Sequence, residues 1–235
     1  VSRGFIVVAL DHSFDANLTI FPDGHLADYR SNITGHPDSL NVRTMQMNTR
    51  VADISFILDQ LDKIQSGKIE SQINAKIDLE RVAVGGHSYG GSTATVVSQR
   101  DNRIKACFSL DSWISPIPQE TIDDGIHIPF LFMGRPTWDG SDYPGNYPRL
   151  DSLMAHSSNP KYRLIIKGTK HLDYSDIPLF SPIIGYVLDV GSNPAALTVS
   201  LINELVHGFL VKHLLGESND IFDNAIDNDL VYQIQ

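Results

Sequence analysis

A short segment near the middle of the chain places the strongest constraint on its fold. Residues 81–86 read Arg-Val-Ala-Val-Gly-Gly, which predicts a buried strand, and residues 92–99 continue as a helix rich in small side chains. The junction contains Gly86-His-Ser88-Tyr-Gly90, a G-x-S-x-G pattern that composition alone produces roughly 0.1 times in a chain of this length. A serine at such a junction sits on a strained turn that lifts its hydroxyl above the sheet. We expect Gly86 and Gly90 to be required because the backbone approaches itself closely around Ser88.

The other apolar runs predict a parallel sheet. Residues 104–110, 128–133 and 162–167 read as further strands that are buried on both faces. Helices alternate with them, because apolar residues recur at helical spacing over 51–64 and over 194–216. This alternation favours an α/β fold, with a mostly parallel sheet covered by helices on both faces. Functional residues in such sheets gather where the strands end.

The two ends of the chain give less regular signals. Residues 5–10 form a continuous apolar run that predicts another buried strand, and residues 11–41 read as a long surface loop. The sequence has no initiator methionine, and we expect it to be incomplete at its N-terminus and to lack the first strands of its sheet. Residues 217–235 are rich in Asp and Asn and predict a surface tail.

Composition excludes several classes of protein. Lys and Arg number 18 and Asp and Glu 28, so the net charge is −10 with neutral histidines. A net anion repels phosphate backbones, which argues against nucleic acid as a partner. No apolar run approaches the roughly 18 residues that a membrane span needs, so we expect a soluble chain. The single cysteine, Cys107, makes neither an internal disulfide nor a zinc site, and we expect no metal and no cofactor. The compartment stays open, with secretion slightly favoured over the cytoplasm.

A serine hydroxyl needs a base before it can act as a nucleophile, and the base is usually a histidine oriented by a carboxylate. In this pattern the residues follow the order serine, acid, histidine along the chain. His171 is the preferred base because it lies a few residues after the strand at 162–167. Other histidines precede the serine, lie within the last helix, or follow Gly86 and should point the other way; these are His12, His207, His213 and His87.

Two carboxylates compete for the role of the acid. Asp111 directly ends the strand at 104–110, whereas Asp139 follows the next strand with Asp142 close behind it. An unpaired charge at the end of a buried strand costs several kcal/mol, and a histidine partner would offset that cost. Residues 134–149 instead read as an irregular aromatic loop, in which a carboxylate can be solvated. This argument favours Asp111 and leaves Asp139 open.

Taken as a set, these segments resemble the plasma-type (group VII) platelet-activating-factor acetylhydrolases, which are serine esterases with the α/β-hydrolase fold. The similarity runs from Gly4 to about Gly216 and is carried by the stretches GFIVVALDH, GHSYGG, CFSLDSWISPIP, IKGTKHLDYSD and VKHLLG. In that family the acid of the triad is an Asp in a Leu-Asp-x-Trp context, and Leu110-Asp111-Ser-Trp113 matches this context. The resemblance therefore implies a single α/β-hydrolase domain over residues 1–235 and Asp111 as the acid.

The resemblance also implies a mechanism and a substrate class. Ser88 attacks an ester carbonyl, His171 takes its proton, Asp111 orients His171, and the backbone N–H of Tyr89 stabilises the oxyanion. The implied substrates are phospholipids with a short or oxidised sn-2 acyl chain, cleaved without calcium. Members of the family carry a His-Gly-rich loop that supplies a second oxyanion donor. We find no such loop in this sequence, so we expect an upstream segment or a second chain to supply the donor.

The substrate contacts and the rival functions are less constrained. Residues 177–188 are apolar and predict an acyl-pocket lining or a contact with a lipid surface, unless they form a buried helix. Trp113 and Phe180 are the candidate pocket residues. The alternatives are a broad short-chain esterase or polyesterase, another enzyme of the same fold such as a peptidase, and a binding module without catalytic activity.

Overall fold

The computed structural model describes residues 3–30, 39–73, 76–138, 145–181, 183–219, 222–223 and 231–233. Contacts within the chain group it into two compact units, Val1–Ile77 and Asp78–Gln235, and each unit is described by itself. The assignment of residues 1–235 to one domain stays a prediction.

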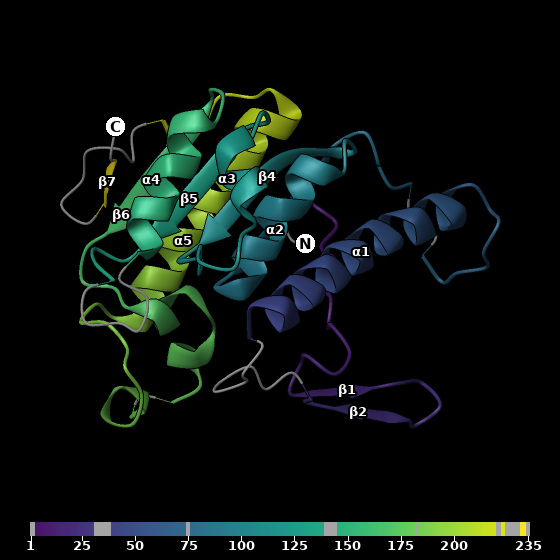
Figure 1. The fold of residues 1–235 in the computed structure, drawn as a ribbon, viewed down its shortest axis with the longest axis horizontal. Coiled ribbons are helices and arrows are strands. Elements are labelled where there is room, and N and C mark those ends of the chain that lie inside the picture. The colour runs from purple at the N-terminus through teal and green to yellow at the C-terminus, as the bar shows by residue number, and fades with distance from the viewer. Residues whose placement is uncertain are drawn as a thin grey trace. The chain divides into compact units, whose positions relative to one another are not determined.

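The first unit combines a short hairpin with one long helix (Figure 1). Strands β1 (Leu18–Ile20) and β2 (Leu26–Asp28) pair antiparallel, and helix α1 spans Ser39–Gln65. The helix prediction is confirmed, and its buried side carries Met47, Val51 and Leu58. Gly67 follows the helix with φ of 72°, a left-handed conformation that ends helices at little cost for glycine.

Two predictions for the first unit are wrong. Residues 5–10 belong to neither sheet, and Ile6, Val7 and Val8 are exposed rather than buried on both faces. An extended segment becomes a strand only when a neighbour pairs with its backbone, and apolar composition alone does not supply that neighbour. The segment predicted as one long loop contains the β1–β2 hairpin.

The second unit is built on a five-stranded sheet. Its strands are β3 (Val82–His87), β4 (Ile104–Leu110), β5 (Phe130–Gly134), β6 (Lys161–Ile166) and β7 (Val231–Gln233), and they lie side by side in that order. The strands from β3 to β6 are parallel, and β7 runs antiparallel to β6. The four parallel strands confirm the prediction from the apolar runs. Strand β5 is buried along its whole length, as expected for a strand covered on both faces.

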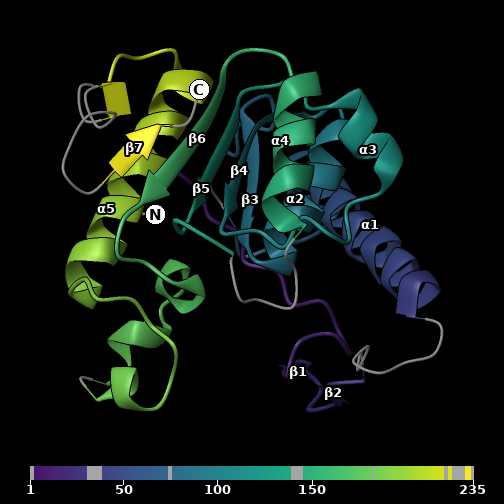
Figure 2. The ribbon, with the colours of Figure 1, turned by 60° about the vertical axis from the view of Figure 1, so that its left-hand side comes forward.

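Helices cover both faces of this sheet, as predicted. They are α2 (Tyr89–Arg100), α3 (Gln119–Asp124), α4 (Asn146–His156) and α5 (Ala195–Leu210), and a π-helical turn, η4 (Val211–Leu215), extends α5 to Gly216. Figure 2 shows α2, α3 and α4 on one face of the sheet and α5 on the other. Three short 3₁₀ turns, η1 (His171–Tyr174), η2 (Ile177–Leu179) and η3 (Ile184–Tyr186), lead from β6 toward α5. The fold is therefore α/β with a mostly parallel sheet.

The last helix departs from one sequence expectation. Among the described residues, Ala195–Leu215 has the length and the mean hydropathy (1.3) of a membrane-crossing helix, whereas the sequence predicted no such segment. One side of this helix packs into the core of the unit, where Leu205 and Phe209 are fully buried. The Phe209 ring meets Tyr162 of β6 edge to face at 6.1 Å. Packing against the core therefore accounts for part of the apolar composition of this helix.

The prediction of a surface tail over 217–235 is wrong for part of that segment. The Phe222 ring is buried against Tyr162 of β6, with the ring centres 4.9 Å apart. Val231 is fully buried and pairs with Ile166 as β7 extends the sheet. An acidic segment can still contribute buried residues when single apolar side chains within it reach the core.

Candidate active site

The turn between β3 and α2 has the strained geometry that its sequence predicts. Ser88 has φ of 56° and ψ of −122°, a conformation that costs a non-glycine residue about 1–3 kcal/mol. Backbone hydrogen bonds hold it there, because the Ser88 N–H donates to Leu110 at 3.0 Å and its carbonyl accepts from Trp113 at 3.3 Å. Leu110 is the last residue of β4, and Trp113 lies three residues after it. The strain at Ser88 is thus stabilised from the neighbouring strand.

The glycines around Ser88 differ from the sequence prediction in one respect. A Cβ on Gly86 would lie 2.5 Å from the carbonyl carbon of Gly90, so the requirement for Gly86 is confirmed. A Cβ on Gly90 would meet nothing within 4 Å, so the predicted requirement for that glycine is wrong. The second close approach falls at Gly91, where a Cβ would overlap the Ser112 hydroxyl and lie 2.8 Å from the Gly86 carbonyl oxygen. The α2 backbone packs against β4 through Gly91.

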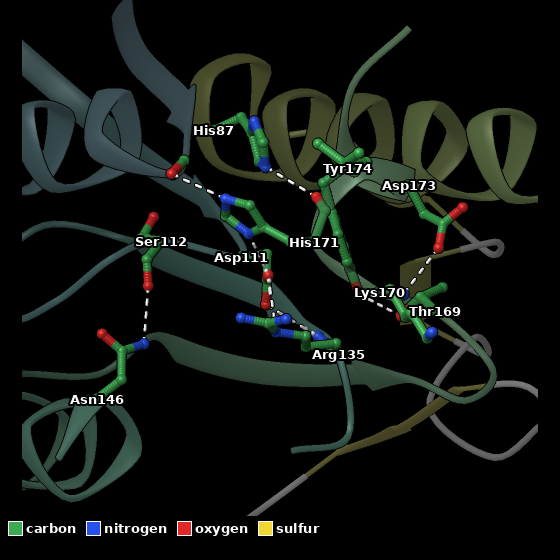
Figure 3. Close-up of polar contacts among 12 residues, drawn as sticks. His87, Asp111, Ser112, Arg135, Asn146, Thr169, Lys170, His171, Asp173 and Tyr174 are labelled. Atoms are coloured by element: carbon green, nitrogen blue, oxygen red, sulfur yellow. Dashed lines mark hydrogen bonds and ion pairs between the residues drawn. The ribbon is translucent and has the colours of Figure 1, made fainter. Parts of the chain in front are cut away.

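The structure brings Ser88, Asp111 and His171 together at the ends of three strands. The His171 Nε2 atom lies 2.9 Å from the Ser88 Oγ, and its Nδ1 lies 2.6 Å from the Asp111 Oδ2. Figure 3 shows the imidazole directed at the carboxylate. With these partners Nδ1–H donates to the carboxylate and Nε2 accepts from the hydroxyl. Asp139 and Asp142, the competing acids, lie outside the described residues.

Asp111 is fully buried and has, besides His171, a cationic neighbour that the sequence reasoning missed. Arg135, directly after β5, donates its backbone N–H to Oδ1 at 3.1 Å and places its Nε 3.2 Å from Oδ2. The guanidinium also lies 3.9 Å from the ring centre of Trp138, whose edge meets the His171 ring at 5.6 Å. A cation directly after a strand of a parallel sheet was the available signal, because such positions converge on one edge.

His87 was predicted to point away from this cluster, and that prediction is wrong. Its Nε2 lies 2.9 Å from the backbone carbonyl oxygen of His171, and the two imidazole rings are 4.5 Å apart (Figure 3). Burial, together with the positive charge that His171 can carry, lowers the pKa of His87 to about 4. At neutral pH His87 is therefore uncharged and donates Nε2–H to the carbonyl.

The loop that carries His171 is held by a buried carboxylate. Asp173 accepts the backbone N–H groups of Lys170 at 2.7 Å and of Gly191 at 2.6 Å through the same oxygen, Oδ2. Thr169 adds a hydrogen bond from its hydroxyl to the Ile166 carbonyl at the end of β6, at 2.7 Å. These hydrogen bonds fix the position of η1, which begins with His171, relative to the end of β6.

A match to the model of a protein family shows which family this chain belongs to. The model described as platelet-activating factor acetylhydrolase, isoform II, matches residues 1–230, which is nearly the whole chain. The chain belongs to this acetylhydrolase family. The resemblance drawn from GHSYGG and the other stretches is thereby confirmed.

Individual relatives agree with this family. The platelet-activating factor acetylhydrolase of Canis lupus familiaris is 27% identical over 96% of this chain and 55% of its own length. A probable 1-alkyl-2-acetylglycerophosphocholine esterase of Arthroderma benhamiae is 24% identical over 94% of this chain and 56% of its own length. The chain thus spans about half the length of these curated relatives. A ferulic acid esterase from Streptomyces cinnamoneus shares the fold, with a TM-score of 0.74 and 21% identity, covering 96% of this chain and 64% of that one.

Within this acetylhydrolase-family chain, the apolar segment after His171 is exposed. The side chains of Phe180 and Tyr186 are 76% and 91% exposed, and Val187 is exposed as well. The alternative of a buried helix over 177–188 is wrong. Pro178 lies in the first turn of η2, and the described part of the segment forms only short 3₁₀ turns, too short to bury one long face.

The remaining candidates occupy other places. The Trp113 ring lies 5.7 Å from that of Tyr89, the first residue of α2. His207 lies in α5, His213 contacts the Tyr162 hydroxyl at 3.1 Å, and His12 pairs with Asp53 at 2.7 Å in the first unit. Among the described residues, no group of three or more His, Cys, Asp and Glu side chains is arranged to hold a metal ion.

Proposed function

We propose that this chain hydrolyses carboxylic esters through a Ser88–His171–Asp111 triad. The observation that carries the proposal is the continuous pair of hydrogen bonds from Asp111 through His171 to Ser88, 2.6 and 2.9 Å long. Membership of the acetylhydrolase family supports it. The strained turn at Ser88 supports it as well, because such strain is commonly retained at functional sites.

The reaction proceeds in two halves. In the first, the Ser88 Oγ bonds to the ester carbonyl carbon while its proton passes to His171 Nε2. The tetrahedral intermediate then collapses, and His171 returns the proton to the leaving alcohol. In the second half, water loses a proton to His171 and attacks the acyl-enzyme, which releases the acid and restores the Ser88 hydroxyl. Asp111 remains ionised throughout and stabilises the imidazolium.

The oxyanion is stabilised at the N-terminus of α2. Tyr89 is the first residue of that helix, and helix N-termini carry a partial positive charge of about half an elementary unit. We assign its backbone N–H as one donor. The expectation of a second donor from an upstream segment or a second chain stays a prediction; a missing donor would lower turnover about 10²–10³-fold.

The substrate class we propose is an alkyl glycerophosphocholine with an acetyl or other short or oxidised sn-2 acyl group. The names of the relatives support this class. The exposed apolar side chains of Phe180, Tyr186 and Val187 support a transient contact with a lipid surface, because exposed apolar patches commonly mark such contacts. A broad short-chain esterase or polyesterase is the alternative, and a comparison of acetyl phospholipid with simple short-chain esters separates the two.

The test uses the full chain, a chromogenic short-chain ester and an organophosphonate label. Ser88→Ala is expected to leave less than about 1% of turnover and to abolish labelling, because the nucleophile is gone. Ser158→Ala, which alters an exposed serine, is the matched control. Substantial turnover by Ser88→Ala would refute the assignment. A wild-type chain that neither turns over ester nor takes up the label would instead favour the binding-module alternative.

A further inference from the structure

His87 lies next to Ser88 and His171, although the proposed reaction gives it no role. It is the last residue of β3 and directly precedes Ser88. Its Nε2 lies 2.9 Å from the carbonyl oxygen of His171, and its ring packs on the His171 ring at 4.5 Å with 40° between the planes. The half-buried His87 thus contacts the backbone of the residue that would act as base.

We propose that His87 is a positioning residue that anchors the His171 backbone to the strand carrying Ser88. This inference rests on the proposed function. This hydrogen bond completes a closed loop of bonds between Ser88 and His171. It runs along the backbone from Ser88 to His87, through the His87 imidazole to the His171 carbonyl, and through the His171 side chain back to the Ser88 hydroxyl.

This closed loop of bonds sets the distance between the nucleophile, Ser88, and the base, His171. His171 begins a short 3₁₀ turn, which has weaker hydrogen bonds than an α-helix and tolerates displacement. Asp173 links this turn to Gly191 by a hydrogen bond, and His87 links it to the end of β3, next to Ser88. Misplacement of a reacting group by about 1 Å can lower a rate about 10²-fold. An anchor from β3 therefore acts on turnover rather than on substrate affinity.

The charge state of His87 suits this role. The charged and titratable groups that act on it are His171, Asp111 and Arg135. His171 gains a proton in each half of the proposed reaction, and a second imidazolium at 4.5 Å would oppose that step. Burial lowers the pKa of His87 to about 4, so the ring stays neutral while its Nε2–H still donates.

Three substitutions separate the hydrogen bond from the ring contact. His87→Phe keeps a ring and removes the donor, His87→Gln keeps an amide donor and removes the ring, and His87→Met has the length of Gln without a donor. We expect Phe and Met to lower kcat about 10–100-fold with KM changed less than about threefold, and Gln to restore kcat to within about fivefold of wild type. The rate of phosphonate labelling at Ser88 should fall in parallel with kcat.

A spectroscopic readout distinguishes positioning from a general loss of stability. The NMR resonance of the proton between His171 Nδ1 and Asp111 should shift or broaden in the Phe and Met variants and return in the Gln variant, because it reports the alignment of that 2.6 Å bond. The control is His213→Phe, which alters a partly buried histidine paired with Tyr162 and should leave both kcat and this resonance unchanged. Thermal unfolding of each variant shows which are folded.

The outcomes separate this inference from the proposed function. If Ser88→Ala keeps its turnover, the proposed function fails whatever the His87 variants do. If Ser88→Ala is inactive and folded His87→Phe or His87→Met retains kcat within about twofold of wild type, the positioning role is overturned. Equal kcat values for the Gln and Met variants overturn it as well, because the two side chains have similar lengths and only glutamine carries an N–H donor. If the Phe variant does not fold, the Gln and Met pair decides.

Discussion

Arg135 meets the carboxylate of Asp111 twice, through its backbone N–H at 3.1 Å and through its guanidinium Nε at 3.2 Å. Asp111 is fully buried, so its charge would be costly without these partners. One carboxylate oxygen, Oδ2, lies between the Arg135 cation and the His171 ring. The acid of the proposed triad thus has a permanent countercharge as well as its histidine.

Loss of this countercharge should reduce stability. We expect Arg135→Leu to lower the free energy of unfolding by about 2–4 kcal/mol, because a buried carboxylate loses a charged partner while it keeps the backbone N–H of residue 135. Chemical denaturation measures the change. Arg81→Gln is the control, since the Arg81–Asp78 pair is exposed and should contribute little. An Arg135 variant as stable as this control would contradict the interpretation.

The two glycines after Tyr89 should respond in opposite ways to alanine. Gly91→Ala is expected to destabilise the chain by about 1–3 kcal/mol, because the new methyl group would overlap Ser112 and crowd the Gly86 carbonyl. Gly90→Ala enters open space within a helix and should be neutral or stabilising by up to about 1 kcal/mol. Paired thermal or denaturant unfolding checks this order. The reverse order would show that the close approach falls at Gly90.

The choice between the two acids can be measured directly. Asp111→Asn should lower kcat about 10³–10⁴-fold, because an amide no longer stabilises the imidazolium or selects the tautomer with Nδ1–H. Asp139→Asn is expected to retain most of the activity and serves as the matched variant. If Asp139→Asn were the inactive one, the acid would have been wrongly assigned.

Stability should fall in acid in a manner that depends on His87. Its pKa is about 4 in the folded chain and near 6.5 when unfolded, so between these values the unfolded state binds more protons. Above about pH 6.5 His87 is neutral in both states and does not oppose folding. As the pH falls toward 4, its protonation in the unfolded state lowers the free energy of unfolding by up to about 3 kcal/mol. His12 and His213 act in the same direction, since burial lowers the pKa of each.

The His87 contribution is isolated by comparing wild type with His87→Gln. The difference in unfolding free energy between the two chains should change in favour of the variant as the pH is lowered from about 7 to 4.5, because glutamine does not titrate. A difference that stays constant over this range would mean that His87 is not held neutral by burial.

Contact with a lipid surface should depend on the exposed apolar side chains. Phe180→Ser combined with Tyr186→Ser is expected to lower hydrolysis of micellar esters several-fold, because less apolar area is available to leave water. Hydrolysis of monomeric short-chain esters should stay near the wild-type rate. Phe56→Ser, an exposed phenylalanine of α1, is the control. Equal losses on both substrates would argue that these residues line the acyl site instead.

Much of the second unit followed from local sequence patterns. Apolar runs located β3 to β6 because a buried parallel strand must be apolar along its length. The G-x-S-x-G pattern located the strained turn at Ser88 because glycine is required where two backbone segments meet. Position at the strand ends made His171 the preferred base and left Asp111 and Asp139 as candidate acids, since parallel strands bring their carboxyl ends to one edge.

Other features were decided by tertiary structure alone. The same apolar composition predicted a strand at residues 5–10 and allowed burial at 177–188, yet both segments are exposed, because burial depends on which neighbours a segment finds. The contact between His87 and His171 joins residues 84 positions apart, and the contact between Arg135 and Asp111 joins residues 24 positions apart. The sequence by itself determined which residues are available at the strand ends. Only the packing of β3, β4, β5 and the turn after β6 determined which of these side chains meet, since side-chain direction at a strand end is set by long-range contacts that no local pattern encodes.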